Sequence, residues 1–221
     1  MVHKDPDPWR KTKVWDIGTR LFHWLLAISF GLSVYSAFQD KFGIYADMHL
    51  YAGLAILVLV VWRIVWGFVG SETSRFSQFV KSPQHTLRYL TASTTPPIGH
   101  NPLGGYSVLL MLLLLLAQAS LGLFASDDML FSGPLSAHAG AAAGDIRDIH
   151  ALLGRILMAV VALHLTAVFW YSIRHKAKLI WPMLTGFKTL DENEKSPAIK
   201  SPWLAAGVLL IVLATLYGLV L

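Results

Sequence analysis

Five long apolar runs divide the chain and limit its fold more than any other feature. Each is close to the roughly 20 residues that a helix needs to cross a bilayer core, where lipid offers no partner to an irregular backbone or an open sheet edge. The runs lie at about residues 21–38, 50–69, 106–125, 151–173 and 203–221. Only 14% of the residues are charged, against roughly 25% in soluble domains. The sequence therefore predicts an all-α integral membrane protein, and we expect the first run to be retained because no small-residue cleavage pattern follows it.

The basic residues lie in alternate connections between these runs. They precede the first run, separate the second from the third and follow the fourth: Lys4, Arg10, Lys11, Lys13 and Arg20; Arg75, Lys81 and Arg88; Arg174, Lys176, Lys178, Lys188, Lys195 and Lys200. By the positive-inside rule we expect a cytoplasmic N-terminus and, after five crossings, a C-terminus on the outer side. The net charge of +5 thus reflects topology, and we expect no nucleic-acid partner.

The predicted organisation has four parts. Residues 1–16 form a cytoplasmic leader, 17–175 a core of four transmembrane helices, 176–201 a cytoplasmic linker and 202–221 the fifth helix. Within the core, a segment at about 74–90 mixes aromatic and basic residues as amphipathic pieces on a membrane surface do, although a solvated loop fits equally well. The fifth helix has no charge and no histidine, so we expect it to pack or to dock a partner, with a place in a ligand pocket as the alternative.

Two histidines of the fourth run, His150 and His164, are 14 residues apart. A helix returns over this interval to within roughly 40° of its starting direction and rises by about 21 Å. The depths implied by the charge pattern pair His150 with His49 near the outer side, and His164 with His23 near the inner side. Ionisable residues are costly in lipid and mark functional sites. Four histidines at two paired depths therefore predict two binding sites, one near each face of the membrane.

Each pair suits a haem iron, which takes two imidazoles from facing helices at one level. The chain has no cysteine, which excludes thiolate-held iron–sulfur clusters and haem attached through C-x-x-C-H. We predict a four-helix transmembrane bundle that binds two haems b, with its first, second and fourth helices as mutual neighbours. The remaining histidines are expected on the surface: His3, His85, His100, His138 and His175.

Glycine follows both outer histidines at the i+4 position. Gly53 after His49 and Gly154 after His150 lie on the same helix face one turn along. A missing side chain there leaves room for the porphyrin, and close helix packing is the alternative.

Three arginines are candidate partners of the haem propionates. Arg155 and Arg63 lie inside apolar runs, where a cation needs an anionic partner, and Arg20 lies just before the first run. Snorkelling of the side chain to the membrane surface is the alternative, above all for Arg63.

Several short motifs, taken in order, resemble the bacterial cytochrome b561 family. They are Val14-Trp15-Asp16, Arg20-Leu21-Phe22-His23-Trp24, His49 with Arg63 and Trp66-Gly67, Asn101-Pro102-Leu103-Gly104-Gly105, His150 with His164, and Leu184-Thr185-Gly186. This family includes the b-type cytochrome subunits of nickel-iron hydrogenases and is related to the formate dehydrogenase gamma subunit. The resemblance covers about residues 12–188 and leaves the fifth helix outside it.

The resemblance implies a protein of the bacterial cytoplasmic (inner) membrane, with two haems b held by His23, His49, His150 and His164. It also implies respiratory electron transport between a quinone pool and a redox partner such as a hydrogenase, a dehydrogenase or a cytochrome c. We therefore expect an electron-transfer subunit of an oxidoreductase, surrounded by membrane lipid, rather than a stand-alone enzyme.

Two alternatives stay open. One is a stand-alone haem oxidoreductase that takes electrons from superoxide and reduces quinone, against which the acidic outer connection at Asp127 and Asp128 argues. The other is a histidine-lined metal or proton transporter without haem, for which the 14-residue interval is too long to serve one metal ion. The sequence indicates neither the direction of electron flow nor the oligomeric state.

Overall fold

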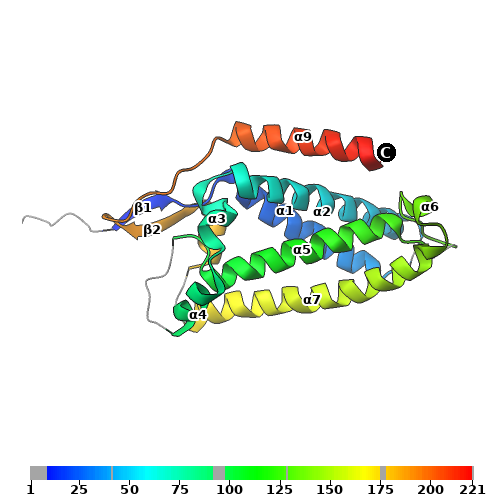
Figure 1. The fold of residues 1–221 in the computed structure, drawn as a ribbon, viewed down its shortest axis with the longest axis horizontal. Helices are drawn as coiled ribbons and strands as arrows, with labels where there is room; N and C mark the ends of the chain where they lie inside the picture. The colour runs from blue at the N-terminus through cyan, green and yellow to red at the C-terminus, as the bar shows by residue number, and fades with distance from the viewer. Residues whose placement is uncertain (1–8, 41, 92–97, 128, 175–177, 221) are drawn as a thin grey trace, which may run out of the picture.

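The computed structural model of the chain describes residues 9–40, 42–91, 98–127, 129–174 and 178–220, so that His3 and His175 lie outside the described residues. Five helices are long and apolar enough to cross a membrane, and they run side by side (Figure 1). They are α1 (Ile17–Ala37), α2 (Ile44–Val69), α5 (Pro102–Phe124), α7 (Ala143–Arg174) and α9 (Pro202–Val220). This architecture confirms the all-α membrane fold.

Two of these helices begin well before their apolar runs. α2 starts at Ile44 and α7 at Ala143, so that His49 and His150 lie inside their helices rather than at the first residue. The added turns contain Asp47 and Asp145, and carboxylates near a helix N-terminus are favoured by the helix dipole. Hydropathy alone misses these turns because charged residues interrupt their apolar residues.

Side-chain caps fix the starts of two other helices. The Asp16 carboxylate accepts a hydrogen bond of 2.8 Å from the backbone N–H of Thr19 at the start of α1. The Asn101 side chain does the same for Gly104 at 2.6 Å, with Pro102 as the first residue of α5. These interactions satisfy N–H groups that have no partner within the helix.

α2 is the central helix of the bundle. α1, α5 and α9 pack on α2, while the main packing partner of α7 is α5. The shared core contains Trp66 and Val60 of α2, Leu115 of α5 and Leu157 of α7. The sequence predicts that the first, second and fourth helices are mutual neighbours around the haems. α1, α2 and α7 line one cavity, while the close packing partner of α7 is α5.

A two-stranded antiparallel sheet joins the predicted leader to the predicted linker. β1 (Trp9–Lys13) pairs with β2 (Phe187–Asp191), from Trp9 opposite Asp191 to Lys13 opposite Phe187. Before β2, the short helix α8 (Ile180–Thr185) ends at Gly186, whose φ of +88° favours glycine. We call this end of the molecule the β-sheet end (Figure 1).

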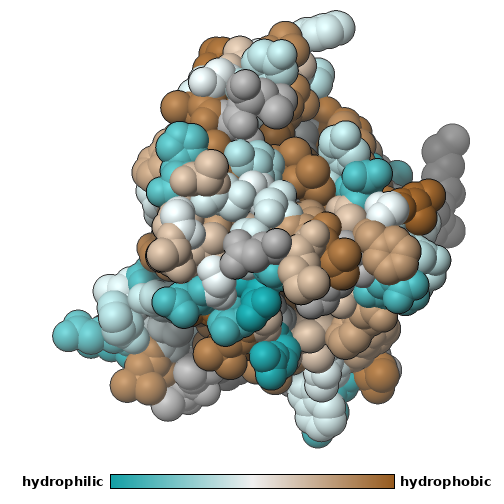
Figure 2. Space-filling view, turned by 90° about the vertical axis from the view of Figure 1, so that its right-hand side faces the viewer, coloured by the Kyte–Doolittle hydropathy of each residue, from teal (hydrophilic) through white to brown (hydrophobic). Residues whose placement is uncertain are grey.

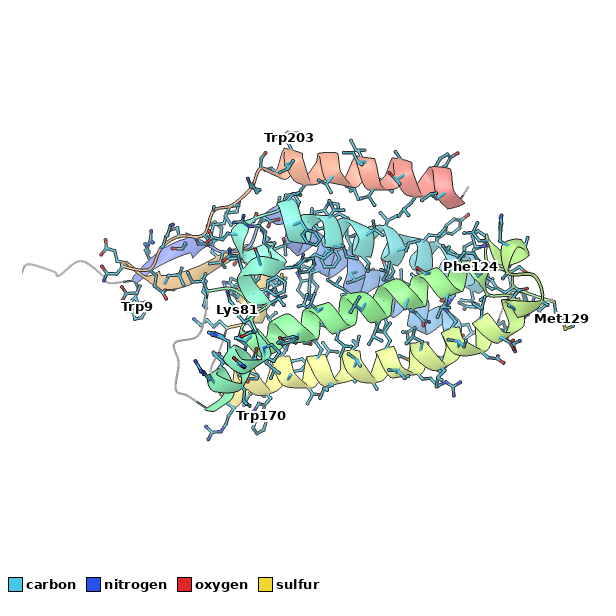
Figure 3. The ribbon with its side chains drawn as sticks, viewed as in Figure 1. Trp9, Lys81, Phe124, Met129, Trp170 and Trp203 are labelled. Carbon is cyan, nitrogen blue, oxygen red and sulfur yellow. The ribbon has the colours of Figure 1, made fainter. Side chains whose placement is uncertain are left out.

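The connection between α2 and α5 also lies at the β-sheet end. It contains the 3₁₀ turn η1 (Glu72–Ser74) and the short helices α3 (Phe76–Phe79) and α4 (Pro83–Thr91). Figure 3 shows the labelled Lys81 and Trp170 at this end with Trp9, and Phe124 and Met129 at the opposite end. Whether α3 and α4 lie on a membrane surface stays a prediction.

The opposite end contains the connection between α5 and α7, and we call it the α6 end. The short helix α6 (Ser136–Ala139) and the 3₁₀ turn η2 (Gly140–Ala142) lie here. Just before them, the Asp127 carboxylate accepts backbone hydrogen bonds from Leu130 at 2.8 Å and Phe131 at 2.9 Å, which fixes a tight loop. Figure 2, which looks onto this end, shows hydrophilic residues gathered in the lower half of the face beside hydrophobic ones.

Candidate functional site

His49 and His150 face one another near the α6 end. His49 comes from α2 and His150 from α7, and their ring centres are 6.1 Å apart with an angle of 79° between the ring planes. Both side chains are half-buried. The structure therefore brings together the two histidines that the sequence pairs at the outer level, although their helices are not close packing partners.

Backbone carbonyls orient both rings. Nδ1 of His49 lies 3.0 Å from the carbonyl oxygen of Ser33, and Nδ1 of His150 lies 3.0 Å from that of Gln118. Because a carbonyl can only accept, each Nδ1 is the donor, and in the neutral ring Nε2 keeps a lone pair. At His150 this lone pair faces the Gln118 amide. A histidine that ligates a metal commonly shows this hydrogen bond on its other nitrogen.

The two rings line a cavity of about 420 Å³. Gly53 and Gly154 also line it. A Cβ atom added at Gly53 would meet no atom within 4 Å, whereas one at Gly154 would lie 3.1 Å from Nε2 of Gln118. Gly53 thus leaves open space beside His49, and Gly154 leaves space that the Gln118 side chain fills.

Gln118 is a cavity residue that the sequence analysis did not select. Its side-chain Nε2 lies 3.1 Å from Nε2 of His150, and its Oε1 is buried without a hydrogen-bond partner among the described residues. The signal was present, since Gln118 is a strongly polar residue inside the third apolar run. Its side-chain amide would have to turn aside for Nε2 of His150 to bind a metal.

His23 and His164 form the second group, closer to the β-sheet end. They come from α1 and α7 and lie within electrostatic range of each other. Among the described residues their rings make no mutual contact, and His23 instead packs edge-on against Trp24 with ring centres 5.1 Å apart. Nδ1 of His23 is buried and has no hydrogen-bond partner among the described residues. This pair is therefore looser than the outer one.

His100 joins this second group, contrary to the expectation of a surface histidine. Its ring packs against Trp15 and Phe79, with ring centres 5.0 and 4.8 Å away. Burial lowers the pKa of His100 to about 3, and the positive charges of Arg63, His23 and His164 add to this effect. His100 is therefore neutral at pH 7. Its Nδ1 is also buried without a partner among the described residues.

Arg63 is buried beside this group, with only 2% of its surface exposed. Its guanidinium lies over the rings of Phe76 and Phe79, and Nη2 donates a hydrogen bond of 3.0 Å to the carbonyl of Ser74. The side chain therefore does not snorkel to the surface.

The other two candidate arginines have different surroundings. Arg20 donates hydrogen bonds to the backbone carbonyls of Met183 and Leu184, which attaches α1 to α8. Arg155 is exposed, lines the outer cavity and donates to the carbonyl of Ala151 in its own helix.

A bis-imidazole metal centre fits the outer pair. Bonds of about 2 Å from a metal to each Nε2, as imidazole makes to zinc, give roughly 6 Å between the centres of two rings on opposite sides of one ion. The observed 6.1 Å agrees. Within the described residues no three His, Cys, Asp or Glu side chains gather as a metal-ion site.

The chain was compared with known proteins in three ways. A family model described as prokaryotic cytochrome b561 matches residues 14–186. No curated protein and no solved structure matches the chain. The match begins at Val14 and ends at Gly186, and the backbone N–H of Val14 donates a 2.8 Å hydrogen bond to the carbonyl of Gly186. The two ends of the matched region are therefore hydrogen-bonded to each other, and α9 lies outside this region.

Proposed function

Because the chain belongs to the prokaryotic cytochrome b561 family, we propose that it transfers electrons across the bacterial inner membrane with two haems b, each held by two histidines. Membership itself makes the chain a multi-pass b-type cytochrome of membrane electron transfer. The proposal adds the number of haems, their ligands and the reaction partners.

The outer histidine pair carries the proposal. The 6.1 Å between the ring centres of His49 and His150 supports a shared iron, as does the hydrogen bond of each Nδ1 to a carbonyl, which leaves Nε2 of the neutral ring as the ligating atom. Haem, when bound, supplies a one-electron carrier whose potential depends on its axial ligands and on burial. We assign His49 and His150 to one haem and His23 and His164 to the other.

The surrounding residues shield and shape the outer site. Phe131 packs against the His49 ring in a T-shaped arrangement, with ring centres 6.4 Å apart. Gly53 and Gly154 border the same cavity, where we assign them to haem clearance. We assign Arg155, which also lines this cavity, as the partner of a propionate.

The positions of the two sites favour transfer between the two faces of the membrane. α7 carries a histidine of each pair, 14 residues apart, which is about 21 Å along the helix. We assign the β-sheet end to the cytoplasm because the basic connections gather there. A quinone in the membrane and a redox protein, such as a hydrogenase, a dehydrogenase or a cytochrome c, are the proposed partners.

Haem counting tests the ligand assignment. A pyridine haemochrome assay should find two haems b per chain in the unsubstituted protein and one in each of the variants His150→Ala and His164→Ala. The exposed His138 provides the control, and His138→Gln should keep both haems. Two haems per chain in His164→Ala would refute the inner pair, and a purified chain without a Soret band would favour the transporter.

A partner assay tests the electron-transfer assignment. We expect the purified chain to be reduced by a quinol analogue and to pass electrons on only when a redox protein is added. Sustained quinone reduction by superoxide without any protein partner would instead support the stand-alone oxidoreductase.

A further inference from the structure

Three nitrogen atoms near the inner histidines are buried without a hydrogen-bond partner among the described residues. They are Nδ1 of His23, Nη1 of Arg63 and Nδ1 of His100. Phe79 packs against two of these side chains, because the Arg63 guanidinium lies 5.9 Å from its ring centre and the His100 ring centre lies 4.8 Å from it. Arg63 and His100 therefore share one region, and His23 lies within electrostatic range of His100. Buried polar atoms are nearly always paired in folded proteins, and three exceptions in one place indicate that a ligand completes the region.

The charge of Arg63 indicates the chemistry of this ligand. The guanidinium is buried within a membrane-spanning helix and, among the described residues, forms no ion pair. A buried cation without an anion is strongly unfavourable, and a guanidinium matches the planar shape of a carboxylate. Arg63 therefore favours a ligand that offers negatively charged oxygen atoms.

Asp16 is the nearby carboxylate, but other groups already use it. Its oxygens accept hydrogen bonds from Thr19 at 2.9 Å and from Ser74 at 3.1 Å, as well as a longer one of 3.4 Å from Trp66. Asp16 thus attracts the guanidinium from a distance and leaves its Nη1 without an acceptor.

We infer that Arg63 and His100 together bind a carboxylate of the haem held by His23 and His164. The inference rests on the proposed function. It adds His100 as a binding residue, and it selects Arg63 among the three candidate arginines as the partner of the inner haem. Nη1 of Arg63 and Nδ1 of His100 act as the donors, because a neutral imidazole can place its one proton on Nδ1. A carboxylate held by Arg63 and His100 would direct that edge of the inner haem toward the β-sheet end.

The loss of haem from the full-length protein tests this inference. His49→Ala disrupts the outer pair and leaves the inner pair to be measured alone. The protein is loaded with haem b or with its dimethyl ester, in which both carboxylates are blocked, and the Soret band is followed after mixing with excess apomyoglobin. We expect the ester to leave about a hundredfold faster than haem b, since it lacks both proposed hydrogen bonds to the carboxylate and each is worth about tenfold.

Substitutions identify the donors. Arg63→Gln and His100→Gln should each speed the loss of haem b about tenfold and leave the loss of the ester unchanged, because the ester makes neither contact. The exposed His85 of α4 lies at the same end, and His85→Gln should change neither rate. If Arg63→Gln fails to accumulate, His100→Gln and the ester comparison at the unsubstituted inner site still test whether the carboxylate is bound there.

Each contrary result has a distinct meaning. Equal loss of haem b and ester from the unsubstituted inner site would overturn the inference and leave the ligation intact. Equal acceleration of both forms by a substitution would show that the residue only supports the fold. A His49→Ala protein that holds no haem would refute the proposed ligation, and this inference with it.

Discussion

At the scale of single residues, Gly53 offers the sharpest test of the outer site. A side chain at Gly53 would enter the cavity without meeting another atom of the chain within 4 Å at its Cβ. Gly53→Leu should therefore leave the bundle folded but fill space beside His49, reducing the haem content from two to about one per chain. The control is Gly207→Leu in α9, where an added Cβ is equally free. Two haems in Gly53→Leu would show that this glycine is not needed for haem clearance.

His100 should give the haem-free protein a pH-dependent stability. Its pKa is lowered to about 3 in the folded chain, first by burial and then by neighbouring positive charges, against about 6.5 when unfolded. Between these values the unfolded chain binds the extra proton, so the free energy of unfolding decreases as the pH falls from 6.5 toward 3. We expect the melting temperature of the haem-free chain to drop more between pH 7.5 and 5 than that of His100→Gln. Parallel curves would contradict a buried neutral His100.

At the scale of elements, α9 is attached through close contacts to α1 and α2. The Trp62 indole N–H donates a 3.0 Å hydrogen bond to the carbonyl of Ala205, and a Cβ added at Gly18 would lie 2.9 Å from Cβ of Ala205. Gly18→Leu should therefore push α9 away and destabilise the protein by about 1–3 kcal/mol, measured by thermal melting. Gly31→Leu, in the same helix but with open space, should have little effect.

Truncation separates the α9 contact from other effects of Gly18→Leu. In a chain that ends at Ser201 the cost of Gly18→Leu should shrink, because the clash with Ala205 is gone. An undiminished cost would assign the effect to Asp16 and Trp62, whose Oδ1 and Cη2 would lie 3.1 and 3.2 Å from the same Cβ. Loss of α9 leaves an apolar face that lipid covers, so the truncated chain should still insert.

The elements also show what the sequence reveals and what it does not. Apolar runs identify all five helices, because hydrocarbon thickness sets their length. The pairing of β1 with β2 could not be predicted, since each strand is only five residues long and the whole four-helix core separates the two strands in the sequence. The burial of His100 is hidden for a related reason, as Trp15 and Phe79 cover it from distant segments.

At the scale of the whole molecule, the orientation of the chain in the membrane can be measured with single introduced cysteines, because the chain has no cysteine of its own. Met129 at the α6 end is 89% exposed, and His85 of α4 is exposed on the connection between α2 and α5. If the basic connections are cytoplasmic, a membrane-impermeant maleimide should label Met129→Cys in intact spheroplasts, and His85→Cys only after permeabilisation. The reverse pattern would invert the proposed topology.

Loop charge and histidine depth together predict two levels of paired residues, and the structure brings His49 and His150 into ring contact. The inner pair and the assignment of haem ligands stay predictions. The sequence did not show that α5 stands beside α7 and supplies Gln118, because the packing order of helices depends on side-chain fit across the bundle rather than on hydropathy.

The strand pair has a consequence for the order in which the protein is made. β1 is synthesised before the four helices of the core and β2 after α7, so the sheet can form only after the ribosome has produced the whole four-helix core. Until then β1 has no partner strand at the β-sheet end. At the end of this interval the inner histidines His23 and His164 have both been synthesised, while the β-sheet end is not yet held by its strand pair.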